Sequence, residues 1–236
     1  MPCPLKSAQT RVTGRARPGL TAPVKRLVLL ALVLGGCLVQ PALAGPTEDL
    51  EVLPAPRTTG GKPLLQALAE RQTRREFKPD PLTPGQLSDL LWAAFGVNRP
   101  ASGHCTAPSA KNAQEIDLYV VRADGAFLFE PGPHRLRRVA TGDLRRLTGD
   151  QDFAATAPVT LVLVADLAKF ADTPETAARR YAAFDAGCIS QNVYLFAASE
   201  GLATVVHELN REPLARALQL RDGQHIILAQ AVGWPR

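Results

Sequence analysis

The chain has 236 residues, of which 46% are hydrophobic and 21% charged, as in an ordinary globular protein of one domain or two small ones. Its formal net charge is +5, but six of its 27 basic residues and none of its 22 acidic residues lie in residues 1–44. The remainder holds 21 basic against 22 acidic residues, a balance that argues against a nucleic-acid-binding surface.

Residues 1–44 have the features of a secretory signal peptide. Lys25 and Arg26 precede an apolar run of 13 residues, LVLLALVLGGCLV, and Ala42-Leu43-Ala44 forms a small-x-small cleavage site. The run is short for a membrane span. Three alternatives stay open. The segment could be an uncleaved anchor, or translation could start at a later codon. Lipid could also be attached at Cys37, which lies in a sequence that resembles the lipoprotein cleavage box. The pattern predicts an exported, periplasmic protein, held at the membrane only if Cys37 is lipidated.

Residues 45–61 are rich in Pro, Thr and Gly and are predicted to be a linker or an arm that lies along a partner. Residues 62–70 are predicted to form a short helix. In the ERQTRREF segment that follows, Arg71, Thr73 and Arg75 alternate, so in an extended chain they share one side. Two guanidiniums and a hydroxyl there suit a phosphate, because the planar donor fork of Arg matches phosphate oxygens. A solvated, charged helix end is the alternative explanation.

Helices and strands are interspersed along the rest of the chain. Thr83 and Pro84 predict the start of a helix that Gly96 ends, and residues 98–109 predict a loop. Further helices are predicted over residues 143–148, 174–200 and 211–219, a connection over 134–140, and strands over 116–122, 126–130, 159–166, 202–206 and 225–233.

The Asp124-Gly125 pair between the first two strands predicts a hairpin. The hairpin favours an α+β fold, with a mostly antiparallel central sheet flanked by helices, over a doubly wound fold. The sequence has neither a Gly-rich dinucleotide turn nor a P-loop, so a phosphate site must use side chains.

Four pieces of sequence, in order over residues 63–236, resemble the nitroreductase-like FMN-dependent oxidoreductases. ERQTRREF resembles the Arg-x-Ser-x-Arg-x-Phe motif of that family, with Thr73 in place of Ser, and APSAKNAQ at residues 107–114 resembles its Pro-Ser-x-x-Asn-x-Gln loop. Residues 185–202 resemble its long central helix, after which ATVVHEL matches the strand and loop over the flavin. AVGWPR resembles its closing Val-Gly-x-Pro.

The resemblance implies FMN bound at the interface of an intimate homodimer. The implied flavin contacts are Arg71, Thr73 and Arg75 for the phosphate and ribityl chain, Pro108, Ser109, Asn112 and Gln114 for the ring, Glu208 for the other ring face, and Arg236 for the phosphate. Ser109 and Asn112 could instead be turn residues bonded to their own backbone, and Glu208 could be a surface acid.

Within the family, LLWAAFGVN at residues 90–98, before a Thr-Ala-Pro-Ser loop, is similar to the branch that oxidises azoline rings in peptides. That branch is associated with a Lys-Tyr pair, whereas this chain has Arg180-Tyr181, which puts azoline oxidation in doubt.

The resemblance implies ping-pong hydride transfer through FMN, to or from a small organic substrate. No protein nucleophile is required, and Glu208 is a candidate orienting group. No metal site is expected, since the spacing of Cys105 and Cys188 carries no metal or redox signature. NAD(P)H as donor is uncertain for an exported protein. Two alternatives remain: a flavin-binding module of the cell envelope without turnover, and a cytosolic nitro- or quinone reductase with misassigned first codons.

Overall fold

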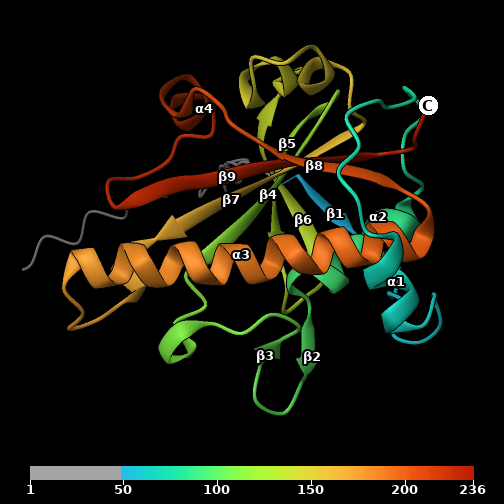
Figure 1. Cartoon of the computed structure of the whole chain (residues 1–236). Coiled ribbons are helices and arrows are strands. Elements are labelled where there is room, and N and C mark those ends of the chain that lie inside the picture. The colour runs from blue at the N-terminus through green and yellow to red at the C-terminus, as the bar shows by residue number, and fades with distance from the viewer. Residues whose placement is uncertain (1–48) are drawn as a thin grey trace, which may run out of the picture. The chain divides into compact units, whose positions relative to one another are not determined.

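A seven-stranded sheet forms the middle of the domain, in the order β1-β6-β5-β4-β7-β9-β8 (Figure 1). This computed structural model describes residues 49–236, so the predicted signal peptide and Cys37 lie outside the described residues. Every neighbouring pair in the sheet is antiparallel, as the hairpin predicted. The strands are β1 (Leu50–Val52), β4 (Ile116–Arg122), β5 (Gly125–Glu130), β6 (Arg135–Thr141), β7 (Val159–Asp166), β8 (Ala203–His207) and β9 (Gln224–Gly233).

Helices cover both faces of this sheet. The α-helices are α1 (Leu64–Glu70), α2 (Pro84–Phe95), α3 (Glu175–Glu200) and α4 (Arg211–Ala217). A separate hairpin joins β2 (Val97–Arg99) to β3 (His104–Cys105), and four short 3-10 helices are η1 (Ala110–Asn112), η2 (Arg145–Thr148), η3 (Asp152–Ala155) and η4 (Leu167–Lys169). The α2 and α3 helices pack on one face of the sheet and α4 on the other, which makes three layers (Figure 1).

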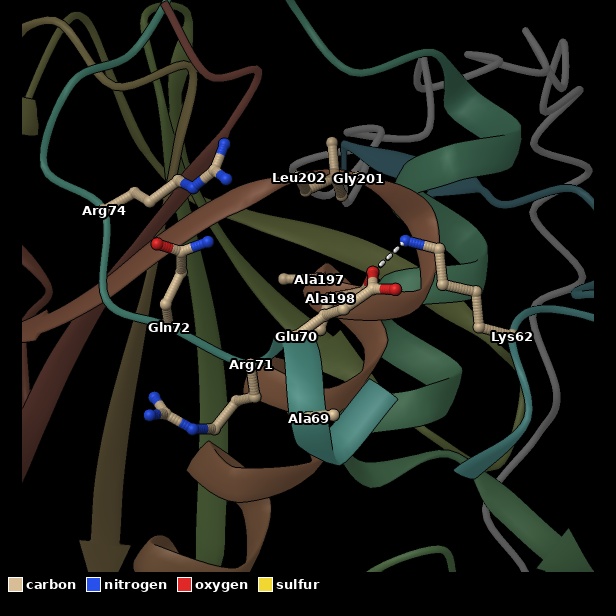
Figure 2. A pocket seen from close by; sticks show the side chains of 10 residues that line it. All are labelled: Lys62, Ala69, Glu70, Arg71, Gln72, Arg74, Ala197, Ala198, Gly201 and Leu202. Atoms are coloured by element: carbon tan, nitrogen blue, oxygen red, sulfur yellow. Dashed lines mark hydrogen bonds and ion pairs between the residues drawn. The ribbon is translucent and has the colours of Figure 1, made fainter. Parts of the chain in front are cut away.

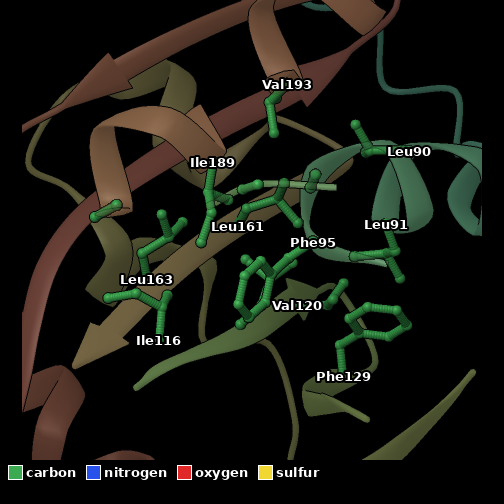
Figure 3. Packing of buried hydrophobic residues seen from close by; sticks show 14 of the residues in the cluster. Leu90, Leu91, Phe95, Ile116, Val120, Phe129, Leu161, Leu163, Ile189 and Val193 are labelled. Atoms are coloured by element: carbon green, nitrogen blue, oxygen red, sulfur yellow. The ribbon is translucent and has the colours of Figure 1, made fainter. Parts of the chain in front are cut away.

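The core follows from the two-residue period of the central strands. On β7, Leu161 and Leu163 pack with Ile189 of α3, as Figure 3 shows. Val162 and Val164 point the other way and belong to the cluster beneath α4. All eight residues of β7 are buried, which confirms the buried strand that its run of Val and Leu predicted. Within residues 49–236 no helix combines the length and the apolarity needed to cross a bilayer.

The structure has four strands that the sequence pattern did not predict. Two of them, β2 and β3, form a short hairpin in the stretch predicted as a loop over residues 98–109. The other two, β6 and β1, belong to the central sheet. The connection predicted over residues 134–140 is β6, where Arg135 and Arg137 both bind Glu130 of β5 across the strand pair, at 2.6 and 3.0 Å. These cross-strand ion pairs stabilise the strand. Its many charged residues break the alternation of apolar and polar residues by which a strand is predicted. β1 lies inside the segment predicted as a linker or an arm and pairs with β6, so this part of the segment packs on the domain itself.

The start of α2 is fixed by a capping box, as Thr83 and Pro84 predicted. Thr83 Oγ1 accepts the Gln86 N–H at 3.3 Å, and Gln86 Oε1 accepts the Thr83 N–H at 2.9 Å. The helix ends at Gly96, where the backbone turns extended, and a side chain does not fit there because a Cβ would lie 2.5 Å from Trp92 Cδ1. Together the two ends fix where α2 meets α3.

Replacing Thr83 with alanine should lower the free energy of unfolding by about 1 kcal/mol, because the cap hydrogen bond is lost. Urea denaturation measures this difference. Thr58→Ala, at an exposed threonine, is the matched control and should change stability by less than about 0.5 kcal/mol. Equal stability of the two variants would contradict a stabilising role for the cap.

Candidate functional site

The basic segment after α1 is extended and runs beside β8, where the Arg74 N–H donates to the Thr204 carbonyl at 3.0 Å. The Arg71 guanidinium carbon lies 5.4 Å from the centre of the Tyr194 ring on α3, and Thr73 Oγ1 lies 3.3 Å from Tyr194 Oη. The alternation thus places Arg71 and Thr73 around one tyrosine, whose hydroxyl also accepts the Val206 N–H at 3.0 Å. The sequence pattern missed Tyr194, because it lies far along the chain.

The C-terminal residues lie against the end of this segment. Phe77 forms a bridge with Pro235, the Lys78 N–H donates to the Trp234 carbonyl at 2.8 Å, and the Arg236 N–H approaches the Glu76 carbonyl at 3.4 Å. The backbone of Arg236 is therefore close to the segment that carries Arg75. The side chains of Arg75 and Arg236 are both exposed.

A pocket of about 410 Å³ opens on the same segment (Figure 2). In Figure 2 the Gln72 amide points toward Arg74, and the Arg71 guanidinium points away from both. Lys62, at its rim, is neutralised by Glu70 at 2.6 Å. Within residues 49–236 no ion pair engages Arg71 or Arg74, so both cations are available to an anion. The pattern assigned only the other side of the segment and so missed Gln72 and Arg74.

The second predicted motif forms a separate pocket of about 240 Å³. All four of its predicted ring contacts line this pocket, with the β2–β3 hairpin as the opposite wall; the lining residues are Arg99, His104, Cys105, Ala107, Pro108, Ser109, Asn112 and Gln114. The structure thus brings Pro108, Ser109, Asn112 and Gln114 together.

The loop that carries these residues has a strained backbone. Lys111, Asn112 and Gln114 have φ values of 56°, 53° and 46°, in the left-handed region that costs about 1–3 kcal/mol for residues other than glycine. The strain is held by hydrogen bonds: the Gln114 N–H donates to Ser109 Oγ at 2.7 Å, and Gln114 Nε2 donates to Asn112 Oδ1 at 3.2 Å. Within the described residues no hydrogen bond engages Nδ2 of the Asn112 side chain, so that donor is free for a ligand.

Glu115, directly after the motif, is a further residue that the pattern missed. Its side chain is fully buried, and Ser109 Oγ donates to its Oε2 at 3.1 Å. Burial, together with the neighbouring carboxylate of Asp185 on α3, raises the pKa of Glu115 to about 7. Asp185 also accepts the Ala110 N–H at 2.7 Å. A charged residue directly before the first apolar residue of a strand was the only available sign.

Glu208 is not brought to either pocket within the described chain. Its carboxylate is exposed and pairs with Arg211 at 2.9 Å, and that guanidinium lowers the pKa of Glu208. This geometry agrees with the alternative of a surface acid as far as a single chain is concerned. Within residues 49–236 no three His, Cys, Asp or Glu side chains gather as a metal site, and Cys105 and Cys188 are free thiols.

One helix carries both halves of the candidate site. On α3, Asp185 contacts the loop of the second pocket and Tyr194 contacts the basic segment. Nine residues of α-helix separate these two positions, which is about 14 Å along the axis. A single chain therefore presents a basic group and a polar amide loop at a fixed separation.

The sequence profile of the Nitroreductase family matches residues 68–234 of this chain. A protein of Methanocaldococcus jannaschii named as a nitroreductase, MJ1384, is 32% identical over 152 residues, which cover 60% of this chain and 76% of that protein. The residues that match the family profile include both ERQTRREF, residues 70–77, and the loop at residues 107–114.

Solved structures of the same fold agree with this result. A crystal structure from Ralstonia eutropha JMP134, also titled as a nitroreductase, has a TM-score of 0.76 and 40% identity and covers 81% of this chain and 92% of that one. The Escherichia coli microcin synthetase McbBCD complex, at 18% identity and a TM-score of 0.62, covers 89% of this chain and 85% of the matched chain, and it shows the shared fold alone. From the profile match and these relatives together, the chain belongs to the nitroreductase family.

Proposed function

We propose that this family member binds FMN and works as an oxidoreductase between a small-molecule electron donor and a small-molecule acceptor. The observation that carries the proposal is the loop pocket, which gathers four residues matching the family's ring-contact motif and leaves Nδ2 of the Asn112 side chain free to donate. When bound, FMN would supply the electron-carrying chemistry, and the chain would bind and orient it. The family membership shown above supports this activity class.

The donor set of the chain fits the two ends of such a cofactor. Arg71 and Thr73, with Arg75 and Arg236 nearby, offer charged and neutral donors for a phosphate. At the other pocket the Asn112 amide offers a neutral donor to the polar edge of a flavin ring. Preorganised donors of this kind stabilise negative charge that develops on a bound group.

A homodimer is the second part of the proposal. Large apolar side chains are exposed on two neighbouring helices of the described chain: Leu64, Leu65 and Leu68 on α1 and Phe184 on α3, with Leu65 79% and Phe184 62% exposed. Large apolar side chains that are exposed on a single chain are typical of a protein–protein interface. A second copy that covers them would bring the basic segment of one chain toward the loop of the other.

Leu65→Glu and Phe184→Glu should each convert a dimer into a monomer, because a buried carboxylate at the interface has no partner. Light scattering after size-exclusion chromatography measures the mass. Val52→Glu is the matched control, since Val52 is equally exposed but lies on β1, and it should remain dimeric. Three variants with the same mass as the unmodified protein would refute this interface.

The activity is tested by an absorbance spectrum of the purified protein, with mass spectrometry of any released cofactor. We expect a yellow protein that contains FMN, whose band bleaches with NADH, NADPH or another donor and recovers with a nitroarene or quinone. A stable yellow protein that no donor bleaches would favour the alternative, a flavin-binding module without turnover. A colourless protein that takes up no FMN would refute both.

We also propose that residues 1–44 direct export to the periplasm. The proposal rests on the charged start, the short apolar run and the small-x-small end of this segment. Mass spectrometry of the mature N-terminus decides between cleavage after Ala44 and a lipidated Cys37. A cytosolic protein whose N-terminus lies downstream of Met1 at neither processing site would support the misassigned-start alternative and make NAD(P)H the natural donor.

A further inference from the structure

A buried carboxyl group lies directly behind the loop of the second pocket. Glu115 is 0% exposed, and its Oε2 accepts the Ser109 hydroxyl at 3.1 Å. Its other oxygen, Oε1, is buried and has no hydrogen-bond partner within the described residues. Asp185 of α3, which is 6% exposed, interacts with the Glu115 carboxyl and accepts the Ala110 N–H at 2.7 Å.

This carboxyl pair has no cation to balance it. Within residues 49–236 neither Glu115 nor Asp185 forms an ion pair. The nearby ammonium of Lys169 is committed to Asp117 at 2.8 Å and to the Gln114 carbonyl at 3.1 Å. For Glu115, desolvation and repulsion from the Asp185 carboxylate both disfavour the ionised form and so raise its pKa.

The strand β7 adds no positive charge to the pair either. The Asp166 N–H of this strand donates to the Glu115 carbonyl, and the Asp166 carboxylate is engaged by Arg221 at 2.7 Å. On the loop itself, the Lys111 ammonium is bound to the Thr173 hydroxyl at 2.8 Å. The pair can therefore lower its energy only by keeping a proton.

We propose that Glu115 is a positioning residue, which shares one proton with Asp185 and so holds loop 107–114 in the shape that the cofactor pocket needs. A proton on Oε1 leaves Oε2 free to accept from Ser109 and makes Asp185 the acceptor beside it. Ser109 in turn accepts the Gln114 N–H, and Asp185 accepts the Ala110 N–H. The pair thus fixes the loop on both sides of its left-handed residues.

Loss of this proton would loosen the loop. The folded pKa of Glu115 is about 7, above the ordinary 4.5, because of burial and the charge of Asp185. Between those two values the folded state binds more protons than the unfolded state, so this group makes stability fall as pH rises. Above about 7 the pair carries two buried negative charges, whose repulsion and desolvation favour an opened loop in which water reaches the carboxylates.

Hydrogen exchange of the flavin-free protein, measured for the peptide over residues 107–118 and corrected for intrinsic rates, tests the loop directly. Protection should fall by about tenfold or more between about pH 5.5 and about pH 8.5. Glu115→Gln, which is permanently neutral and can still accept from Ser109 and donate to Asp185, should keep its protection across this range. Glu212→Gln, at an exposed carboxylate of α4, should behave as the unmodified protein.

Asp185→Asn is a second variant that removes the charge but keeps an acceptor for Ala110. It should make the fall in protection with pH smaller, because repulsion from Asp185 no longer adds to burial in raising the pKa of Glu115. Two results would overturn the proposal. One is exchange protection that does not change with pH in the unmodified protein. The other is a fall in protection with pH that is the same in Glu115→Gln and Asp185→Asn as in the unmodified protein.

Flavin affinity supplies the second measurement, and this part rests on the proposed function. The Kd of the unmodified protein should rise by up to about tenfold per pH unit above the pKa of Glu115, and that of Glu115→Gln should stay level. Riboflavin serves as the second probe, because it lacks the phosphate that itself titrates near about 6. If the Kd values of both proteins are equal and do not change with pH, only the proposed role of Glu115 is overturned, and the proposed function stands. No flavin binding at any pH, with the exchange profile as expected, would overturn the proposed function alone.

Discussion

Replacing Arg71 and Arg75 together with alanine is expected to weaken FMN binding by roughly 100- to 10,000-fold. Hydrogen bonds to charged groups contribute about 1.5–3 kcal/mol each, and every 1.4 kcal/mol is about a tenfold change in Kd. Arg71 is held over the Tyr194 ring at 5.4 Å and has no acidic partner within residues 49–236, so its charge is available to a phosphate. Titration of the flavin-free protein with FMN, followed by flavin fluorescence, measures the loss.

The controls separate the phosphate from the rest of the cofactor. Arg216→Ala removes an exposed guanidinium on α4 that pairs with Glu212, and it should leave the Kd for FMN unchanged. Riboflavin, without a phosphate, should bind the double variant as well as the unmodified protein. If Arg74→Ala abolishes FMN binding and the double variant keeps it, the phosphate lies instead in the pocket that Gln72 and Arg74 share.

Ile189→Ala should lower the free energy of unfolding by about 2–5 kcal/mol, because it leaves a cavity where α3 meets the sheet. Ile189 is 0% exposed and packs with Leu161 and Leu163 of β7. Urea denaturation at fixed protein concentration measures the change. Since α3 carries both halves of the candidate site, the same variant should also weaken flavin binding.

A substitution on the exposed part of the same helix is the matched control. Glu175→Ala, in the first turn of α3, loses an exposed pair with Arg179 and should change stability by less than about 1 kcal/mol. A loss of less than about 1 kcal/mol for Ile189→Ala as well would contradict the packing of α3 described here.

Most of the fold could be predicted, because its central elements have clear periods and clear ends. The buried run of β7, the hairpin of β4 and β5, and the cap and stop of α2 all depend on residues close together in sequence. β6 could not be predicted, since its alternating arginines are satisfied by Glu130 on another strand. β1 has only three residues, and its pairing with β6 alone makes it a strand.

The candidate site divides in the same way. Alternation was enough to place Arg71 and Thr73 on one side, and the loop motif was enough to gather four residues around one pocket. Tyr194 and Glu115 could not be found from the pattern. Tyr194 meets Thr73 across 121 positions of sequence, and the importance of Glu115 comes from burial beside Asp185, which only the folded chain creates.

The α3 helix acts as a ruler between the two pockets. Inserting or deleting one residue between Asp185 and Tyr194 would turn one end by about 100° relative to the other, so one of the two contacts would face away from its partner. Only a change of about seven residues, or two turns, restores the facing, and it alters the separation by about 10 Å. The separation of the two pockets on one chain is therefore set in coarse steps, and small insertions in this helix cannot adjust it.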